Sequence, residues 1–128
     1  MLTANENGFS SFIVPRGSIP SRGDVHYRCN RDSGKSYISD QPVNRFYLGK
    51  ICAGNTLQIT IVTSGFKSVT EVIPYEEDGI CYKGHYLPGK SLISENATKG
   101  NYIKLSSLDG KMWHVVESTG EWFKDGLT

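Results

Sequence analysis

The sequence predicts an all-β fold, either an antiparallel β-sandwich or a β-prism-like domain, with seven to nine short strands and an irregular N-terminal arm. Composition is the first reason: the 128 residues include 14 glycines but only three alanines and two methionines, and Ala and Met favour helices whereas Gly does not. Periodicity is the second reason, because several short windows alternate polar and apolar residues and none keeps a helical period over three turns. A chain of this length fits one compact domain.

The N-terminal part is rich in the Pro, Gly, Asp and Ser residues that favour turns. Only two short extended segments fit between these turns, at 25–29 and 36–39. Residues 1–23 contain few apolar side chains to offset the entropy lost on ordering, so we interpret them as an arm that orders when it docks on a partner. The sequence therefore predicts an attachment region over residues 1–45 and a β-domain over residues 46–128.

The strongest strand pattern begins at residue 56. Residues 56–62 alternate polar and apolar side chains, which places the apolar ones on a single face of a strand. That face contains Leu57, Ile59 and Ile61. Residues 69–73 form another β-branched run, and the turn at 63–65 predicts that the two runs pair as a near-hairpin.

A second hairpin is predicted near the C-terminus. Residues 101–105 alternate again, residues 108–111 have the sequence Leu-Asp-Gly-Lys of a tight turn, and residues 112–116 return antiparallel. The apolar side chains that this hairpin buries are Ile103, Leu105, Trp113 and Val115. Shorter strands are expected around 80–82 and 91–93, between glycines.

The three cysteines are separated by 23 and 29 residues. These spacings fit neither a CxxC metal site nor an even disulfide framework. We therefore interpret Cys29, Cys52 and Cys81 as reduced, buried thiols.

The histidines and carboxylates give no motif for catalysis or metal binding. The three histidines have no HxH, HxxxH or HExxH spacing, and His114 is expected to be a core or interface residue. The acidic run 76–78 is interpreted as a solvated turn, with a cation site as the alternative. We predict no metal, no cofactor and no catalytic residue; a small hydrolase that uses His85 or His114 with a nearby carboxylate is a competing hypothesis.

Aromatic residues make up 11% of the chain, and such side chains either fill a sandwich core or stack on sugar rings. We expect most of these aromatic side chains to fill the core of so small a domain. Trp122 and Phe123 lie beyond the last predicted strand, so we expect them to be exposed and to need a partner surface. The candidate glycan contacts are Tyr82, Tyr86 and Trp122.

Three short motifs follow one another in the second part of the chain. They are the strand Asn-Arg-Phe-Tyr-Leu at 44–48, the turn and strand Ala-Gly-Asn-Thr-Leu-Gln-Ile at 53–59, and a hairpin over 100–105 and 111–116 that contains Gly-x-Tyr-x-x-Leu and Trp-x-Val-Val. Together, over residues 44–123, they resemble a β-domain that recurs in the fibres, tailspikes and head spikes of tailed phages. The chain departs from that pattern at 48–52, where Leu-Gly-Lys-Ile-Cys replaces the more usual Leu-Pro run. Members of this family are usually homotrimers.

The resemblance implies a non-enzymatic bacteriophage virion structural protein, a small head or tail fibre, spike or decoration subunit that assembles in the host cytoplasm. A homotrimer would cover the open strand edges with copies of the chain. The residues assigned to its interface and core are Leu57, Ile59, Ile61, Ile103, Leu105, Trp113 and Val115.

The N-terminal part is then expected to dock on capsid or tail proteins. All five arginines lie before residue 46, whereas eight of the nine lysines follow it, and arginine is well suited to protein interfaces. The residues assigned to docking are Arg16, Arg22, Arg28 and Arg31. The net charge of +1 argues against nucleic acid as a partner, and neither an export signal nor a membrane-inserting segment is expected. A carbohydrate-binding domain that recognises a host receptor is the alternative function.

Overall fold

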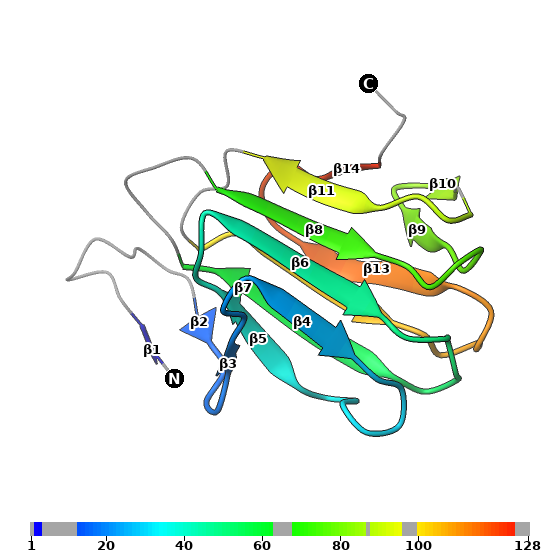
Figure 1. Ribbon diagram of the computed structural model, residues 1–128, viewed down its shortest axis with the longest axis horizontal. Coiled ribbons are helices and arrows are strands. Elements are labelled where there is room, and N and C mark those ends of the chain that lie inside the picture. Colours follow the sequence, from blue (N-terminus) through cyan, green and yellow to red (C-terminus); the bar gives the residue numbers. More distant parts are fainter. Residues whose placement is uncertain (1, 4–12, 63–67, 87, 96–99, 125–128) are drawn as a thin grey trace.

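The computed structural model describes residues 2–3, 13–62, 68–86, 88–95 and 100–124, and twelve strands in this part of the chain build two β-sheets that pack face to face (Figure 1). The described residues contain no helix, and so none that could cross a membrane. The all-β class is confirmed. The sheets mix parallel and antiparallel pairs, however, so the expectation of a purely antiparallel sandwich is wrong.

The larger sheet has seven strands. In spatial order they are β10 (His85–Tyr86), β9 (Ile80–Tyr82), β13 (Trp113–Ser118), β12 (Tyr102–Ser106), β7 (Thr56–Ile61), β5 (Ser36–Ser39) and β3 (Ile19–Pro20). The smaller sheet has five, namely β14 (Phe123–Lys124), β11 (Leu92–Glu95), β8 (Val69–Ile73), β6 (Val43–Leu48) and β4 (Asp24–Tyr27). A separate antiparallel pair joins β1 (Leu2–Thr3) and β2 (Ile13–Val14). Among the described residues, nine strands are three residues or longer, in agreement with the expected seven to nine.

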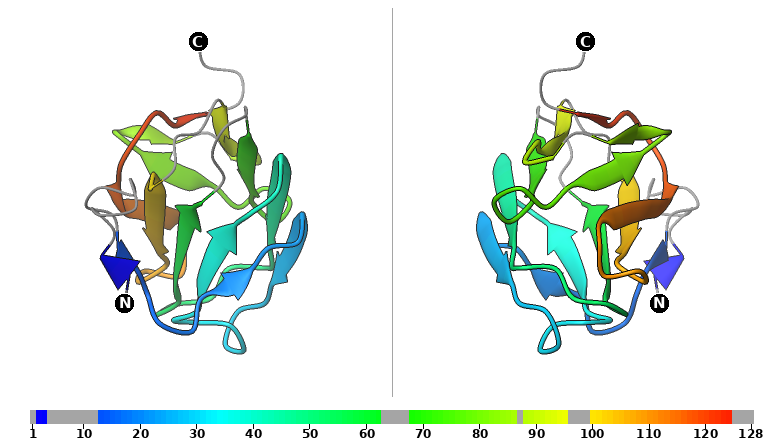
Figure 2. Two further views of the ribbon diagram at one scale, coloured as in Figure 1. Left: turned by 90° about the vertical axis from the view of Figure 1, so that its left-hand side faces the viewer. Right: turned by 90° about the vertical axis from the view of Figure 1, so that its right-hand side faces the viewer.

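From β3 to β8 the chain crosses from one sheet to the other after every strand. As a result β3, β5 and β7 pair in parallel in the larger sheet, and β4, β6 and β8 pair in parallel in the smaller one. Figure 2 shows this winding from its two ends. Successive turns place Ile19 beside Tyr37 and Tyr37 beside Ile59. This segment is thus a flattened coil and not a series of hairpins.

Because of this winding, the expected hairpin between residues 56–62 and 69–73 does not form, and that prediction is wrong. The two strands form, but β7 and β8 lie in different sheets. The reason is that β5 and β12 occupy both edges of β7, whereas β6 and β11 occupy both edges of β8.

The second half of the chain adds mostly antiparallel strands to this coil. The predicted C-terminal hairpin is confirmed, because β12 pairs antiparallel with β13, with an irregularity between Lys104 and Leu105. β11 lies between β8 and β14 in the smaller sheet. β9 is the exception, since it pairs in parallel with β13.

The core lies between the sheets and takes alternate side chains from each strand. In the larger sheet, register places Tyr37, Ile59 and Ile103 in one row across three strands. In the smaller sheet Phe46 and Val72 are partners in the same way, and all five of these side chains are buried. The coil therefore closes a hydrophobic core within one chain.

The apolar residues assigned to a trimer interface belong to this core. Leu57, Ile59, Ile61, Ile103, Leu105 and Trp113 are each at most 3% exposed, and Val115 packs against them. The prediction that these residues form the core is therefore confirmed. Val115 is only half-buried, but a second copy of the chain cannot contact the other six in the folded protein, so their assignment to an interface between chains is wrong. The physical reason is that the smaller sheet of the same chain covers this face.

Residues 19–45 are integral to both sheets. Tyr27 and Tyr37 contribute rings to the core, and the buried Ser21 hydroxyl bonds the Asn44 side-chain oxygen at 2.5 Å. The division expected at residue 45 falls inside β6. Residues 1 and 4–12 of the arm expected at 1–23 lie outside the described residues, and an attachment role for residues 1–45 stays a prediction.

Candidate functional site

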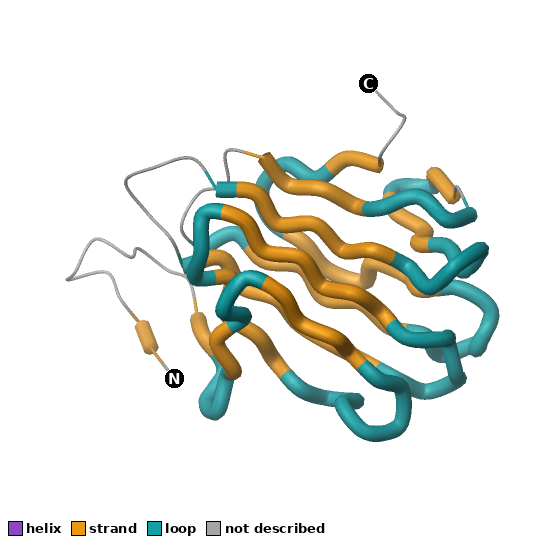
Figure 3. Tube along the Cα trace, viewed as in Figure 1, coloured by secondary structure: helices purple, strands orange, loops and turns teal. Residues whose placement is uncertain are grey.

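Four loops meet at one end of the sandwich, on the right-hand side of Figure 3. They comprise residues 28–35, 49–55, 74–79 and 107–112. The Gly54 amide donates to the Ser107 carbonyl at 3.0 Å, and the Ile51 amide donates to the Asp78 carboxylate at 3.0 Å. These bonds hold loops from both sheets together, so that they form one continuous surface.

An open groove of about 340 Å³ lies at this end of the smaller sheet, between β4, β6 and the loop after β8. His26 and Tyr47 are register partners on β4 and β6. Their rings stack in a near-parallel pair, with centroids 4.9 Å apart and 13° between the planes. Both side chains point outward because strand alternation turns their neighbours Tyr27 and Phe46 into the core.

Polar groups from the adjoining loops complete this groove. Arg28 follows His26 by two residues, and Glu76 comes from the β8–β9 loop together with Tyr75, which is 41% exposed. We refer to the groove lined by His26, Arg28, Tyr47, Tyr75 and Glu76 as the aromatic groove. It offers ring faces for stacking, a guanidinium group that donates hydrogen bonds and a carboxylate that accepts them.

Glu76 has a strained backbone. Its φ angle is +47°, in the left-handed region that favours glycine. The surrounding turn is closed by the Asp78 amide, which donates to the Tyr75 carbonyl at 2.8 Å. Such strain costs about 1 kcal/mol and tends to occur at binding sites. The acidic run thus forms the expected turn, and one of its carboxylates lines the aromatic groove.

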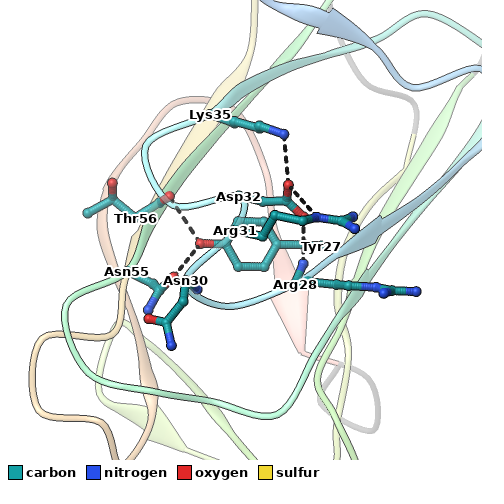
Figure 4. Close-up of polar contacts among 8 residues, drawn as sticks. All are labelled: Tyr27, Arg28, Asn30, Arg31, Asp32, Lys35, Asn55 and Thr56. Carbon is teal, nitrogen blue, oxygen red and sulfur yellow. Dashed lines mark hydrogen bonds and ion pairs between the residues drawn. The ribbon is translucent and has the colours of Figure 1, made fainter.

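The loop that carries Arg28 is fixed by a buried carboxylate (Figure 4). Asp32, 2% exposed, accepts a hydrogen bond from the Arg28 amide at 2.7 Å and one from the Lys35 ammonium at 2.8 Å. Burial alone would raise the pKa of Asp32, but these bonds and the one from Arg31 outweigh it and lower the pKa below its ordinary value. The cluster therefore holds the backbone of Arg28 in place.

Asn55 joins this loop to the other sheet. Its side-chain oxygen accepts hydrogen bonds from the Tyr27 hydroxyl at 3.1 Å and from the Asn30 amide at 3.0 Å. Its backbone amide donates to the Ser107 hydroxyl at 3.1 Å. The turn-and-strand motif at 53–59 contains Asn55, but nothing in its spacing predicts the pairing with Tyr27.

The four arginines assigned to docking do not form one patch. Arg22 precedes β4 whereas Arg28 and Arg31 follow it, so the strand separates them. Arg16 lies in the turn between β2 and β3. Of the four, Arg28 lines the aromatic groove, and Arg31 pairs with Asp32 at 3.4 Å.

The residues assigned to glycan contact also lie apart from the aromatic groove. Tyr82 and Trp122 are each 6% exposed and belong to the core, so the expectation that they present their rings to a ligand is wrong. Trp122 is buried because β14 pairs with β11 and returns the chain to the sandwich. Tyr86 and Phe123 are exposed. Sequence reasoning missed His26 and Tyr47, although strand alternation in 24–27 and 43–48 was a signal that both point outward.

The histidine expected in a core or interface lies on the surface. The His114 imidazole contacts the Asp109 carboxylate at 3.1 Å, and both side chains are about two-fifths exposed. Hydrogen bonds from the Lys111 amide, the His114 side chain and the Met112 amide lower the pKa of Asp109 to about 2. This carboxylate therefore organises the β12–β13 turn.

The cysteines are free but only partly buried, so the expectation of buried thiols is wrong. Cys29 and Cys52 lie in loops, whereas Cys81 lies within β9. Cys29 packs against the core. Within the described ranges, no group of three His, Cys, Asp or Glu residues is arranged to hold a metal ion.

Comparison with protein-family models, curated proteins and solved structures finds no match to this chain. The resemblance to phage fibre domains therefore stays a prediction.

Proposed function

We propose that this chain is a non-enzymatic binding subunit of a bacteriophage virion, of the fibre, spike or decoration kind, and that it binds a host-surface glycan in the aromatic groove. The stacked pair of His26 and Tyr47 carries the glycan part of this proposal. The virion part rests on the sequence motifs.

A sugar suits the aromatic groove for three reasons. Apolar faces of sugar rings pack on aromatic rings such as those of the half-buried Tyr47 and the exposed Tyr75. Hydroxyl groups both donate and accept hydrogen bonds, and Arg28 and Glu76 supply both kinds of partner. The volume of about 340 Å³ lies at the lower end of the range for small-molecule sites, which favours one or two sugar rings.

Rigid support strengthens the case for binding. His26 and Tyr47 project from paired strands, and Arg28 is held by the Asp32 cluster. Sites built on such elements lose little conformational entropy when a ligand binds.

Assembly as a homotrimer and docking on capsid or tail proteins are parts of the same proposal. Contacts between copies have to use outward-facing apolar residues, among which Val43, Val116 and Phe123 are 43%, 60% and 38% exposed. A trimer would present three aromatic grooves, so weak individual affinities would combine through multivalency.

Binding is tested by titrating the full chain with a panel of bacterial surface oligosaccharides in calorimetry. Wild type is expected to bind at least one of them, and Tyr47→Ala is expected to weaken that binding about tenfold or more. Tyr86→Ala is the control, since Tyr86 is a surface tyrosine, 39% exposed, that does not line the aromatic groove. Equal losses in both variants, or no binding to any member of the panel, would contradict the glycan part.

Assembly is tested separately by light scattering at micromolar concentration. Three chains per particle are expected. A stable monomer would overturn the trimer and leave the glycan measurement standing, because the aromatic groove lies within one chain.

A further inference from the structure

We propose that Cys29 and Cys52 form a reversible disulfide within the chain, which joins loop 28–35 to loop 49–55. The inference does not depend on the proposed function. It rests on the placement of the two thiols by the β4–β6 pairing and by the Asn55 side chain.

The backbone brings the two loops together directly after β4 and β6. These strands pair in parallel up to Tyr27 and Leu48, and the Gly49 amide then donates to the Tyr27 carbonyl at 2.8 Å. A Cβ atom placed on Gly49 would lie 3.0 Å from that carbonyl and 4.0 Å from the Cys29 nitrogen. Cys29 therefore continues alongside the segment that leads to Cys52.

The side-chain amide group of Asn55 also links loop 28–35 to loop 49–55. Its oxygen accepts a hydrogen bond from the amide of Asn30, the residue after Cys29, at 3.0 Å. Its nitrogen donates to the Cys52 carbonyl at 3.2 Å and contacts the Cys52 sulfur at 3.6 Å. One side-chain amide group therefore bridges Cys52 and the residue that follows Cys29.

The surroundings favour the protonated form of Cys29 and leave both cysteines partly exposed. Burial, the neighbouring Cys52 thiol and the charge of Asp78 raise the pKa of Cys29 to about 11. Both cysteines are nevertheless partly exposed, so a small disulfide reagent can reach them.

The oxidant that we name is a low-molecular-weight disulfide, oxidised glutathione. The Cys52 thiol loses its proton to solvent, and its sulfur attacks the reagent, which releases one glutathione thiolate and leaves a mixed disulfide. Cys29 then loses its proton, attacks the Cys52 sulfur and releases the second glutathione. Two protein thiols are thus oxidised to one disulfide while one glutathione disulfide is reduced to two thiols.

Cys81 provides an internal control. It lies on β9 in the larger sheet, where its register partners are Tyr86 and His114. Like the other two cysteines, it is partly exposed. Cys81→Ser should leave the proposed disulfide intact, whereas Cys29→Ser and Cys52→Ser should each abolish it.

The full chain is equilibrated with oxidised glutathione, its remaining thiols are blocked with N-ethylmaleimide, and it is then unfolded and digested with trypsin. Cleavage after Arg and Lys places the three cysteines in separate peptides, 29–31, 51–67 and 68–83. We expect a species in which 29–31 is linked to 51–67, in wild type and in Cys81→Ser. In Cys81→Ser, oxidation should also raise the melting temperature on the order of 10 °C, because the link closes a loop of more than 20 residues.

Other results would overturn the proposal. These are links that involve peptide 68–83, glutathione adducts without a link between peptides, a link between two chains seen as a dimer on a non-reducing gel, or complete blocking of all three thiols. If the link forms but the melting temperature does not rise, the disulfide itself is supported and its stabilising effect is contradicted.

Discussion

The hydroxyl group of Tyr27 donates a hydrogen bond to the side-chain oxygen of Asn55 at 3.1 Å, across 28 positions of the sequence. Tyr27 ends β4 in the smaller sheet, and Asn55 precedes β7 in the larger one. Both residues are 1% exposed. The contact therefore ties the two layers together at the end that carries the aromatic groove.

Removal of this bond should destabilise the fold in a graded way. Tyr27→Phe keeps the ring that packs edge-on against Trp113, so only the hydroxyl is lost, at a cost of about 1–2 kcal/mol. Asn55→Ala removes the acceptor of the Asn30 amide and leaves the Tyr27 hydroxyl only its longer bond to the Thr56 carbonyl at 3.4 Å, and should cost about 2–4 kcal/mol. Urea unfolding measures both values. Equal effects of the two substitutions would show that Asn55 does not organise the network.

The Asp32 carboxylate should make stability depend on pH in acid. Its pKa is lower in the folded protein than the ordinary value of 3.8, so its contribution is complete above about pH 4 and is lost as the pH falls through the folded-state pKa. Asp32→Asn should therefore be less stable than wild type at pH 7, by about 1.5–3 kcal/mol. The difference should shrink below pH 4. Free energies of unfolding measured from pH 7 down to pH 2 test this, and a gap of constant size would argue against the role of the charge.

Ile59 tests the position of the core. It is fully buried between the sheets, so Ile59→Val should cost about 1 kcal/mol and Ile59→Asp about 2–5 kcal/mol or more, because a charge loses its solvation. Thr56→Asp on the same strand is the control, since Thr56 is exposed. Circular dichroism during thermal unfolding distinguishes the variants. A folded Ile59→Asp chain that merely fails to assemble would contradict a core closed within one chain.

Relief of strain at Glu76 should stabilise the fold. Glu76→Gly removes the unfavourable side chain at a φ angle of +47°, which should raise the free energy of unfolding by about 0.5–1 kcal/mol. Its neighbour Glu77 does not have a positive φ angle. Glu77→Gly should therefore be neutral or destabilising, because glycine gains more entropy on unfolding. If both substitutions had the same effect, strain at Glu76 would not be the cause.

Local patterns in the sequence predicted much of the fold. The alternating runs at 56–62 and 69–73 became β7 and β8, and the turn at 108–111 closed the expected hairpin. Local patterns did not determine which strands pair with one another. A strand with one apolar face satisfies its periodicity equally well beside its sequence neighbour or across the core from it, and β7 and β8 take the second arrangement.

The candidate site was less predictable than the fold. His26 and Tyr47 lie 21 positions apart and meet because β4 and β6 pair in parallel register. Cys29 and Cys52 approach one another for the same reason, and their spacing matches no metal or disulfide pattern. Trp122 was misjudged because its position near the terminus suggested exposure, whereas the return of β14 to the sheet buries it.

The coiled path from β3 to β8 has a consequence for the rate of folding. Partners in this coil are separated by about one full turn of chain, as Ile19 and Tyr37 are, whereas the β12–β13 hairpin needs only its short 107–112 turn. Closing long loops slows folding, since their entropy is lost before the contacts form. The hairpin is thus expected to form early, and the parallel turns should wind onto it in the slow step that sets the folding time of the whole chain.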